Sequence, residues 1–204
     1  MIRYYLLFIC SVFFLASCNQ KQMKISRAGA SIQTEMTDFS PAYIEKTAQG
    51  EAKLNDNNLI GNTHWVISAE RDLTLEQIAP FLQQLTDKKY SKEGMHPDDK
   101  DIYFVYSDTV NKQNAYVKMP FKTILLEPYP IVLPLPGTDI IYDVESDVIF
   151  KKEMQKLSSI YNNLNSVSME IKSTLTVEQF VALLIAIEEE NKDKMVEYPS
   201  VAIY

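Results

Sequence analysis

The chain has 204 residues, of which 46% are hydrophobic, and its net charge at pH 7 is −7. Proteins that bind nucleic acid usually carry a basic surface, so the acidic balance argues against nucleic acid as a partner. The acidic balance also argues against electrostatic attraction to anionic membranes. The hydrophobic fraction is sufficient for an ordinary hydrophobic core.

The N-terminus carries an export pattern. Arg3 precedes the apolar run of residues 4–14, which is shorter than the roughly 20 residues that span a bilayer and fits a secretory signal. Leu15-Ala16-Ser17-Cys18 then resembles the lipobox of bacterial lipoproteins. The resemblance implies a diacylglycerol on the Cys18 sulfur, cleavage before Cys18 and an acylated amine. Its alternative is an ordinary secretory signal with a chance cysteine.

Lipidation would determine both location and thiol chemistry. Cys10 would leave with the signal peptide (residues 1–17) and Cys18 would carry lipid, so the mature chain would have no disulfide, thiolate metal site or cysteine nucleophile. Asn19 is not the aspartate that marks inner-membrane retention in some lipoproteins, and no acidic run follows it. We therefore expect attachment to the outer membrane, facing the periplasm.

The chain after Cys18 predicts an α+β fold with a mixed sheet and packed helices. Residues 18–40 are polar without periodicity, which predicts a flexible tether, and residues 41–127 form a first lobe. Strands are expected at residues 42–47, 64–70, 102–106 and 115–119. The sequence from Leu73 to Ile78 predicts a helix start, with Thr74 and Gln77 as a capping box. Pro80 conflicts with that helix, and residues 121–126 fit either strand or helix.

The second half repeats part of this pattern. Residues 167–171 alternate like residues 65–69, and Thr176 and Gln179 form a second capping box exactly 102 residues after the first. The repeated strand–helix–strand unit suggests an internal duplication, with coincidence as the alternative. Four prolines within residues 128–137 predict an extended connector to a second lobe, residues 138–204, which forms one compact domain with the first or packs closely against it. An amphipathic helix is expected over residues 143–164.

Few residues suggest chemistry. The sequence lacks a nucleophile elbow, a phosphate-binding loop and a His-Glu-x-x-His zinc motif, so we assign no catalytic residue and no cofactor. His96 lies with carboxylates in one loop, a group that could hold a cation, although a solvated charged loop explains it more simply. The members of this candidate metal site are His96, Asp98, Asp99 and Asp101.

Tyrosines of the middle third are candidate binding residues. Tyrosine presents a large surface at low entropic cost, which suits recognition on half-buried strand faces. The alternative is that these rings build the core and rim of a small sheet. The candidates are Tyr103, Tyr106, Tyr116 and Tyr129.

Residues 64–85, a strand, a charged turn and a Leu-Thr-Leu-Glu-Gln helix, resemble in layout the periplasmic domain of the TolR/ExbD family. That family has an uncleaved transmembrane helix with a functional aspartate, which this chain lacks, so no functional residue transfers. We expect a non-enzymatic adaptor for another envelope protein, held at the membrane by the lipid on Cys18; an immunity or inhibitor protein is a special case. The alternative is a periplasmic hydrolase, metal-dependent through the His96 loop.

Overall fold

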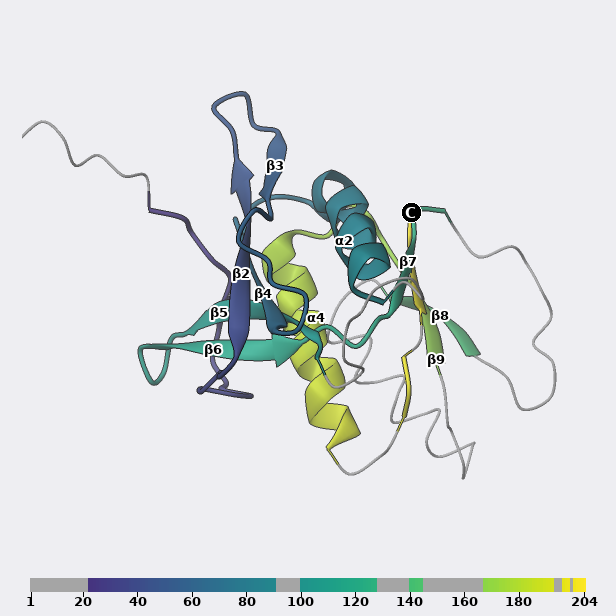
Figure 1. Cartoon of the computed structure of the whole chain (residues 1–204). Helices are drawn as coiled ribbons and strands as arrows, with labels where there is room; N and C mark the ends of the chain where they lie inside the picture. Colours follow the sequence, from purple (N-terminus) through teal and green to yellow (C-terminus); the bar gives the residue numbers. More distant parts are fainter. Residues whose placement is uncertain (1–21, 91–99, 128–139, 145–166, 193–195, 199) are drawn as a thin grey trace, which may run out of the picture.

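The described part of the chain forms two β-sheets and two long helices (Figure 1). The computed structural model describes residues 22–90, 100–127, 140–144, 167–192, 196–198 and 200–204. Both sheets contain parallel strands, one of them also contains antiparallel strands, and the helices pack against them. The expected α+β class is therefore confirmed.

The larger sheet has six strands. Its centre is parallel: β4 pairs with β2 on one side and with β5 on the other. β3 and β6 join antiparallel through hairpins with β2 and β5, and the short β1 pairs parallel with the end of β5. The strands are β1 (Arg27–Ala28), β2 (Phe39–Lys46), β3 (Ala52–Asn55), β4 (His64–Ala69), β5 (Ile102–Asp108) and β6 (Gln113–Lys118).

The second sheet is wholly parallel in the order β7-β10-β9-β8. Its strands are β7 (Thr123–Leu125), β8 (Ile140–Val144), β9 (Val167–Ile171) and β10 (Ser200–Ile203). β7 resolves the ambiguity of residues 121–126 in favour of a strand, and it ties the first half of the chain to this sheet. Asp143 and Val144, expected to begin a helix, instead end β8. The rest of that expected helix, and the connector 128–137, lie outside the described residues.

Helix α2 spans Leu75–Tyr90 and helix α4 spans Val177–Asn191. α2 continues through Pro80, which is exposed in its second turn, so the expected conflict does not end the helix. At α4 the capping box is complete: Thr176 Oγ1 accepts from Gln179 N–H at 3.3 Å, and Gln179 Oε1 accepts from Thr176 N–H at 2.8 Å. Neither helix of the described residues is long and apolar enough to cross a membrane.

The two helix starts face each other in a reciprocal arrangement. Leu75 N–H donates to Leu175 C=O, and Val177 N–H donates to Leu73 C=O, each at 2.8 Å. The two donors, Leu75 and Val177, are 102 positions apart in the sequence, and so are the two acceptors, Leu73 and Leu175. The bridge between Thr74 and Thr176 lies at the centre of the arrangement. The two matching segments of the sequence thus meet in space, and their backbone contacts are related by a local, approximate two-fold axis.

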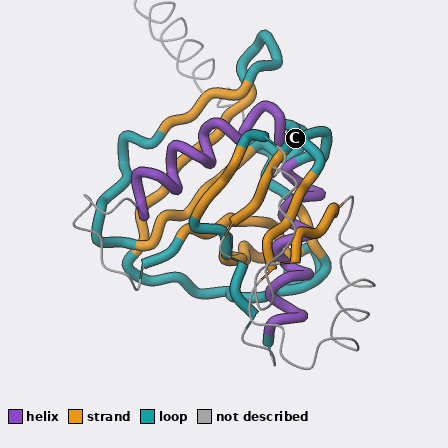
Figure 2. Tube along the Cα trace, turned by 90° about the vertical axis from the view of Figure 1, so that its right-hand side faces the viewer, coloured by secondary structure: helices purple, strands orange, loops and turns teal. Residues whose placement is uncertain are grey.

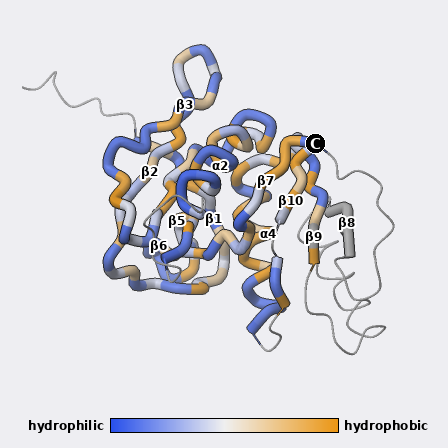
Figure 3. Tube along the Cα trace, turned by 45° about the vertical axis from the view of Figure 1, so that its right-hand side comes forward, coloured by the Kyte–Doolittle hydropathy of each residue, from blue (hydrophilic) through white to orange (hydrophobic). Residues whose placement is uncertain are grey.

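The helices lie between the sheets and each contacts the sheet of the other unit (Figure 1). α2 contacts β7 and β10, whereas α4 contacts β6 and places Phe180 edge-on against Phe104 of β5, with ring centroids 5.7 Å apart. One continuous core results. Figure 2 views the molecule along the direction in which these layers are stacked, so that strands and helices overlap. The hydropathy colouring shows hydrophobic segments in β9 and β10 and a hydrophilic loop between β2 and β3 (Figure 3).

The N-terminal segment, residues 22–33, follows the domain closely where a flexible tether was expected. Arg71 N–H donates to Lys24 C=O, and Ser107 N–H donates to Ser26 C=O. Further along, Tyr116 N–H donates to Gln33 C=O at the edge of β6. Polar composition predicted a tether because these backbone hydrogen bonds need no apolar side chains and leave no periodicity in the sequence.

Candidate functional site

The outer face of the six-stranded sheet, opposite the helices, is curled. Phe39 on β2 and Tyr116 on β6 face each other with ring centroids 6.4 Å apart, although β4 and β5 lie between these strands in the sheet order. Neighbouring strands are about 4.8 Å apart, so a flat sheet would hold these rings much farther apart. Strong twist therefore makes the outer face concave.

A groove of about 400 Å³ runs over this concave face. Val66 and Ser68 of β4 and Val105 of β5 form its floor. We call it the outer-face groove; its volume is within the usual range of ligand pockets, roughly 300–1,000 Å³. Met23, Ile25, Phe39, Pro41, Tyr43, Glu45, Asn114 and Tyr116 complete its lining.

The groove follows from apolar residues on both faces of the central strands. On β4, Trp65 and Ile67 face the core, yet Val66 between them is also only 3% exposed, because it lies beneath the groove. On β2, Phe39 remains 43% exposed on the outer face. The sequence pattern assigned Trp65 and Ile67 to one face of the strand and made no prediction for the other face, so the groove was missed. Val66 in an otherwise alternating strand was the available signal.

The predicted tyrosines separate into different environments. Tyr116 lines the groove. Tyr103 is half-buried on the same sheet face, outside the groove lining, where its ring meets His64 edge-on at 5.4 Å. Burial raises the pKa of Tyr103. Tyr129 lies outside the described residues.

Tyr106 points to the opposite face and is fully buried. Its hydroxyl donates to Ala30 C=O at 2.9 Å and accepts from Ile32 N–H at 3.0 Å. Desolvation is the main cause that raises the Tyr106 pKa. Tyr106 is therefore a core residue that holds the N-terminal segment, as the alternative interpretation of the tyrosines proposed.

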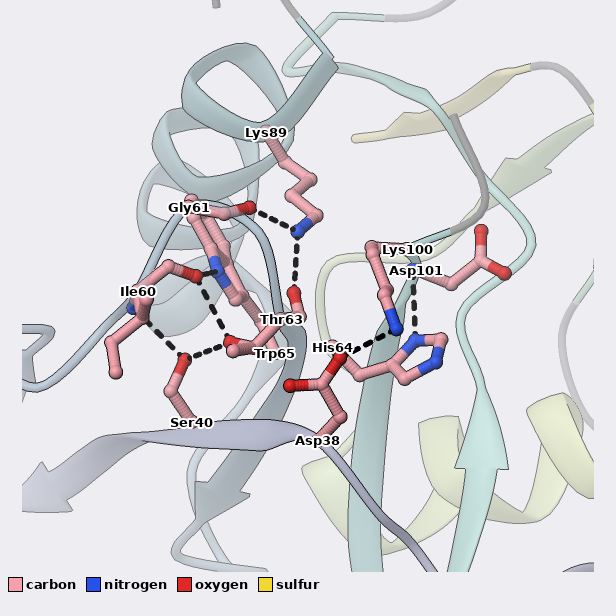
Figure 4. Close-up of polar contacts among 10 residues, drawn as sticks. All are labelled: Asp38, Ser40, Ile60, Gly61, Thr63, His64, Trp65, Lys89, Lys100 and Asp101. Atoms are coloured by element: carbon pink, nitrogen blue, oxygen red, sulfur yellow. Dashed lines mark hydrogen bonds and ion pairs between the residues drawn. The ribbon is translucent and has the colours of Figure 1, made fainter. Parts of the chain in front are cut away.

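The candidate metal loop lies mostly outside the described residues, which include only Asp101 of its four members. Asp101 forms an ion pair with Lys118 at 2.7 Å. Its backbone N–H donates to His64 Nδ1 at 3.1 Å (Figure 4). Beside it, Lys100 donates to Asp38 at 2.7 Å and holds the pKa of that carboxyl below its usual value. Among the described residues no three His, Cys, Asp or Glu side chains gather as metal ligands.

Lys89 of α2 lies on the inner side of the same strands and is only 2% exposed (Figure 4). Its Nζ donates to Thr63 C=O at 2.7 Å and to Gly61 C=O at 3.2 Å, and lies 4.7 Å from the centroid of the Trp65 ring. These contacts satisfy the ammonium group and fix the turn before β4 to the end of α2. We interpret them as structural.

A second hollow of about 400 Å³ opens between the β6–β7 connection and the end of α4. Its lining mixes Lys118 and Lys122 with Glu188 and Glu197, and Lys118 is already paired with Asp101. Opposed charges within one open hollow favour neither an anion nor a cation. The outer-face groove is therefore the better candidate for a binding site.

Comparison with known proteins found no relative from which a function could be inferred. No protein-family model matches the chain, and no curated protein or solved structure matches it.

Proposed function

We propose that this protein is a lipid-anchored, non-enzymatic binding module of the bacterial cell envelope, which recognises another envelope protein through the outer-face groove. The observation that carries the proposal is the concave, largely apolar lining of that groove, described above. Protein interfaces concentrate aromatic residues and methionine at their centre and leave polar groups at the rim. The groove has this composition, with Phe39, Tyr43, Tyr116 and Met23 in its lining and Asn114 among its polar members.

The position of the N-terminal segment supports the link between anchor and groove. Met23 and Ile25 line the groove, and Met23 is only five residues beyond Cys18. A lipid on Cys18 would hold the binding surface at the membrane, which raises the effective concentration of partners in the same membrane. The anchor and the binding surface thus fit a single task, recognition at the membrane surface.

Metabolic labelling tests the anchor. We expect radiolabelled palmitate to enter the wild-type protein and not the Cys18→Ser variant, because only the cysteine sulfur can receive the diacylglycerol on which the rest of the lipidation depends. The Cys18→Ser protein should also leave the membrane fraction. Label in the variant would refute lipidation at Cys18.

Affinity capture tests recognition. The wild-type chain, extracted in mild detergent, should retain one stoichiometric envelope protein, and Tyr116→Asp should lose it because a charge in an apolar contact is poorly solvated. Tyr204→Asp is the matched control, since Tyr204 is 37% exposed and lies outside the groove lining. Equal capture by both variants, with unchanged circular dichroism, would remove the groove from the proposal.

A further inference from the structure

The outer-face groove lies close to the expected anchor, and this closeness restricts what can occupy it. Resting on the function proposed above, we infer that the groove binds a single extended or helical segment of a partner, from the stretch of that partner that lies immediately outside the membrane. The proposed function specifies only that the partner is an envelope protein, and here we specify the segment of that partner that lies in the groove.

Distance is the first step. The N-terminal segment is held against the carboxyl end of β4: Lys24 C=O accepts from Arg71 N–H at 2.9 Å, and Lys24 N–H donates to Glu70 at 3.4 Å. Met23, next to Lys24, lines one wall of the groove. Four residues separate Met23 from Cys18, so the five residue-to-residue steps between them span at most about 17 Å when fully extended. The near end of the groove thus lies within that distance of the lipid attachment.

Size is the second step. A folded domain of 100 residues has a radius of gyration of about 13 Å, so a domain centred at the near end of the groove would collide with the bilayer. A helix is only about 10–12 Å wide, and a strand is thinner. Either can lie in the groove without entering the membrane.

Shape and chemistry are the third step. The bilayer surface is flat and cannot fill a concave face, whose curvature follows from the contact between Phe39 and Tyr116. An acyl chain could fill it but would leave the half-buried hydroxyl of Ser68 on the groove floor without a hydrogen-bonding partner. A peptide backbone supplies both donors and acceptors. The lining therefore favours a peptide segment over lipid.

Photo-crosslinking in living cells tests the inference with the full-length, membrane-attached protein. p-Benzoylphenylalanine replaces Tyr116 in the groove, and in a second strain it replaces Tyr204, the exposed aromatic control outside the groove. We expect an adduct from position 116 and none from position 204. Mass spectrometry should place the crosslinked residue within roughly ten residues of a membrane span or lipidated cysteine in the partner, a stretch of at most about 35 Å when extended.

A spacer variant tests whether the partner segment in the groove must lie close to the membrane. Four Glu-Ala-Ala-Ala-Lys repeats inserted between Asn19 and Gln20 would lift the groove by about 30 Å, and the adduct from position 116 should fall at least tenfold. A Gly/Ser insertion of equal length is the control, because a flexible chain still lets the groove approach the membrane. Ser68→Trp, which fills the groove floor, should abolish the adduct while the melting curve shows that the protein remains folded.

The outcomes distinguish this inference from the proposed function. A protein adduct that survives the helical spacer, or that maps to a folded domain far from the bilayer, overturns the inference and leaves the proposed function standing. A lipid adduct from position 116 also overturns it, since the occupant is then an acyl chain. No adduct from position 116 would contradict both.

Discussion

Asp108 connects three separate parts of the chain through one buried carboxylate. It accepts from the Ser31 hydroxyl of the N-terminal segment, from Asn111 Nδ2 at 2.7 Å, and from the backbone N–H groups of Val110 and Asn111 in the β5–β6 turn. Hydrogen bonds from Ser31 and Asn111 lower the pKa of Asp108 to about 2. One ionised group thus holds the hairpin that carries Tyr116 and the segment that carries the groove wall.

Stability at low pH should report this carboxylate. A carboxyl whose pKa is lower in the folded than in the unfolded chain stabilises the fold above the unfolded pKa, near 3.9 for aspartate, and the stabilisation is lost as the pH falls toward 2. Between pH 4 and pH 2 the free energy of unfolding should therefore fall less steeply for Asp108→Asn than for wild type. Urea titrations across that range measure it, and parallel slopes would contradict the assignment.

At the scale of elements, the two helix starts offer a matched pair with one difference. A capping box consists of two hydrogen bonds, and α4 has both, including the one that the Thr176 side chain accepts from Gln179 N–H. At α2 the bond of this box that forms is the one from Thr74 N–H to Gln77 Oε1, at 3.0 Å. Gln77 uses its amide nitrogen for Gly50 C=O at 2.9 Å. The two helices thus begin with the same sequence pattern but different hydrogen bonds.

The two threonines should therefore differ in their contribution. Thr176→Ala should lower the free energy of unfolding by about 1 kcal/mol, the usual contribution of a threonine cap. Thr74→Ala should lower it by no more than about 0.5 kcal/mol, the lower limit for caps. Chemical denaturation of both variants under one condition gives the comparison. Equal losses would mean that the Thr74 hydroxyl also caps its helix in solution.

Elements with local signals could be predicted from the sequence. The alternation of β4 and the capping pattern of Thr74 with Gln77 depend on neighbours a few positions away. The repeat at 102 residues could be found because each copy carries the same local pattern. The pairing of β7 with β10 and the path of residues 24–33 depend on partners far along the chain, which no local pattern encodes. Of the residues that line the groove, Tyr116 was a candidate from the sequence, while Phe39 and Met23 were not, because they lie far from Tyr116 along the chain.

The whole molecule should behave as one cooperative unit, although the sequence divides at the proline-rich connector. β7 belongs to the first half of the chain yet pairs with β10, and the helices of both units share one core. Separate unfolding of either half would expose that core to water. The described parts of the two halves are thus energetically inseparable.

Calorimetry should accordingly show one transition, with a calorimetric enthalpy equal to the van't Hoff enthalpy. Ile124→Ala, in the buried centre of β7, should shift the entire transition to lower temperature, with a loss of about 2–5 kcal/mol as for other buried isoleucines. Two resolved transitions, only one of which moved with Ile124→Ala, would show that the halves unfold independently.

The reciprocal hydrogen bonds between Leu75 and Leu175 and between Val177 and Leu73 bear on how such a protein can evolve. Two identical chains related by a two-fold axis must present every surface twice, because each substitution appears in both copies. Within one polypeptide, each unit mutates alone. The centre of the contact can keep its symmetry while the outer faces diverge, so that one unit acquires a groove without imposing it on its counterpart.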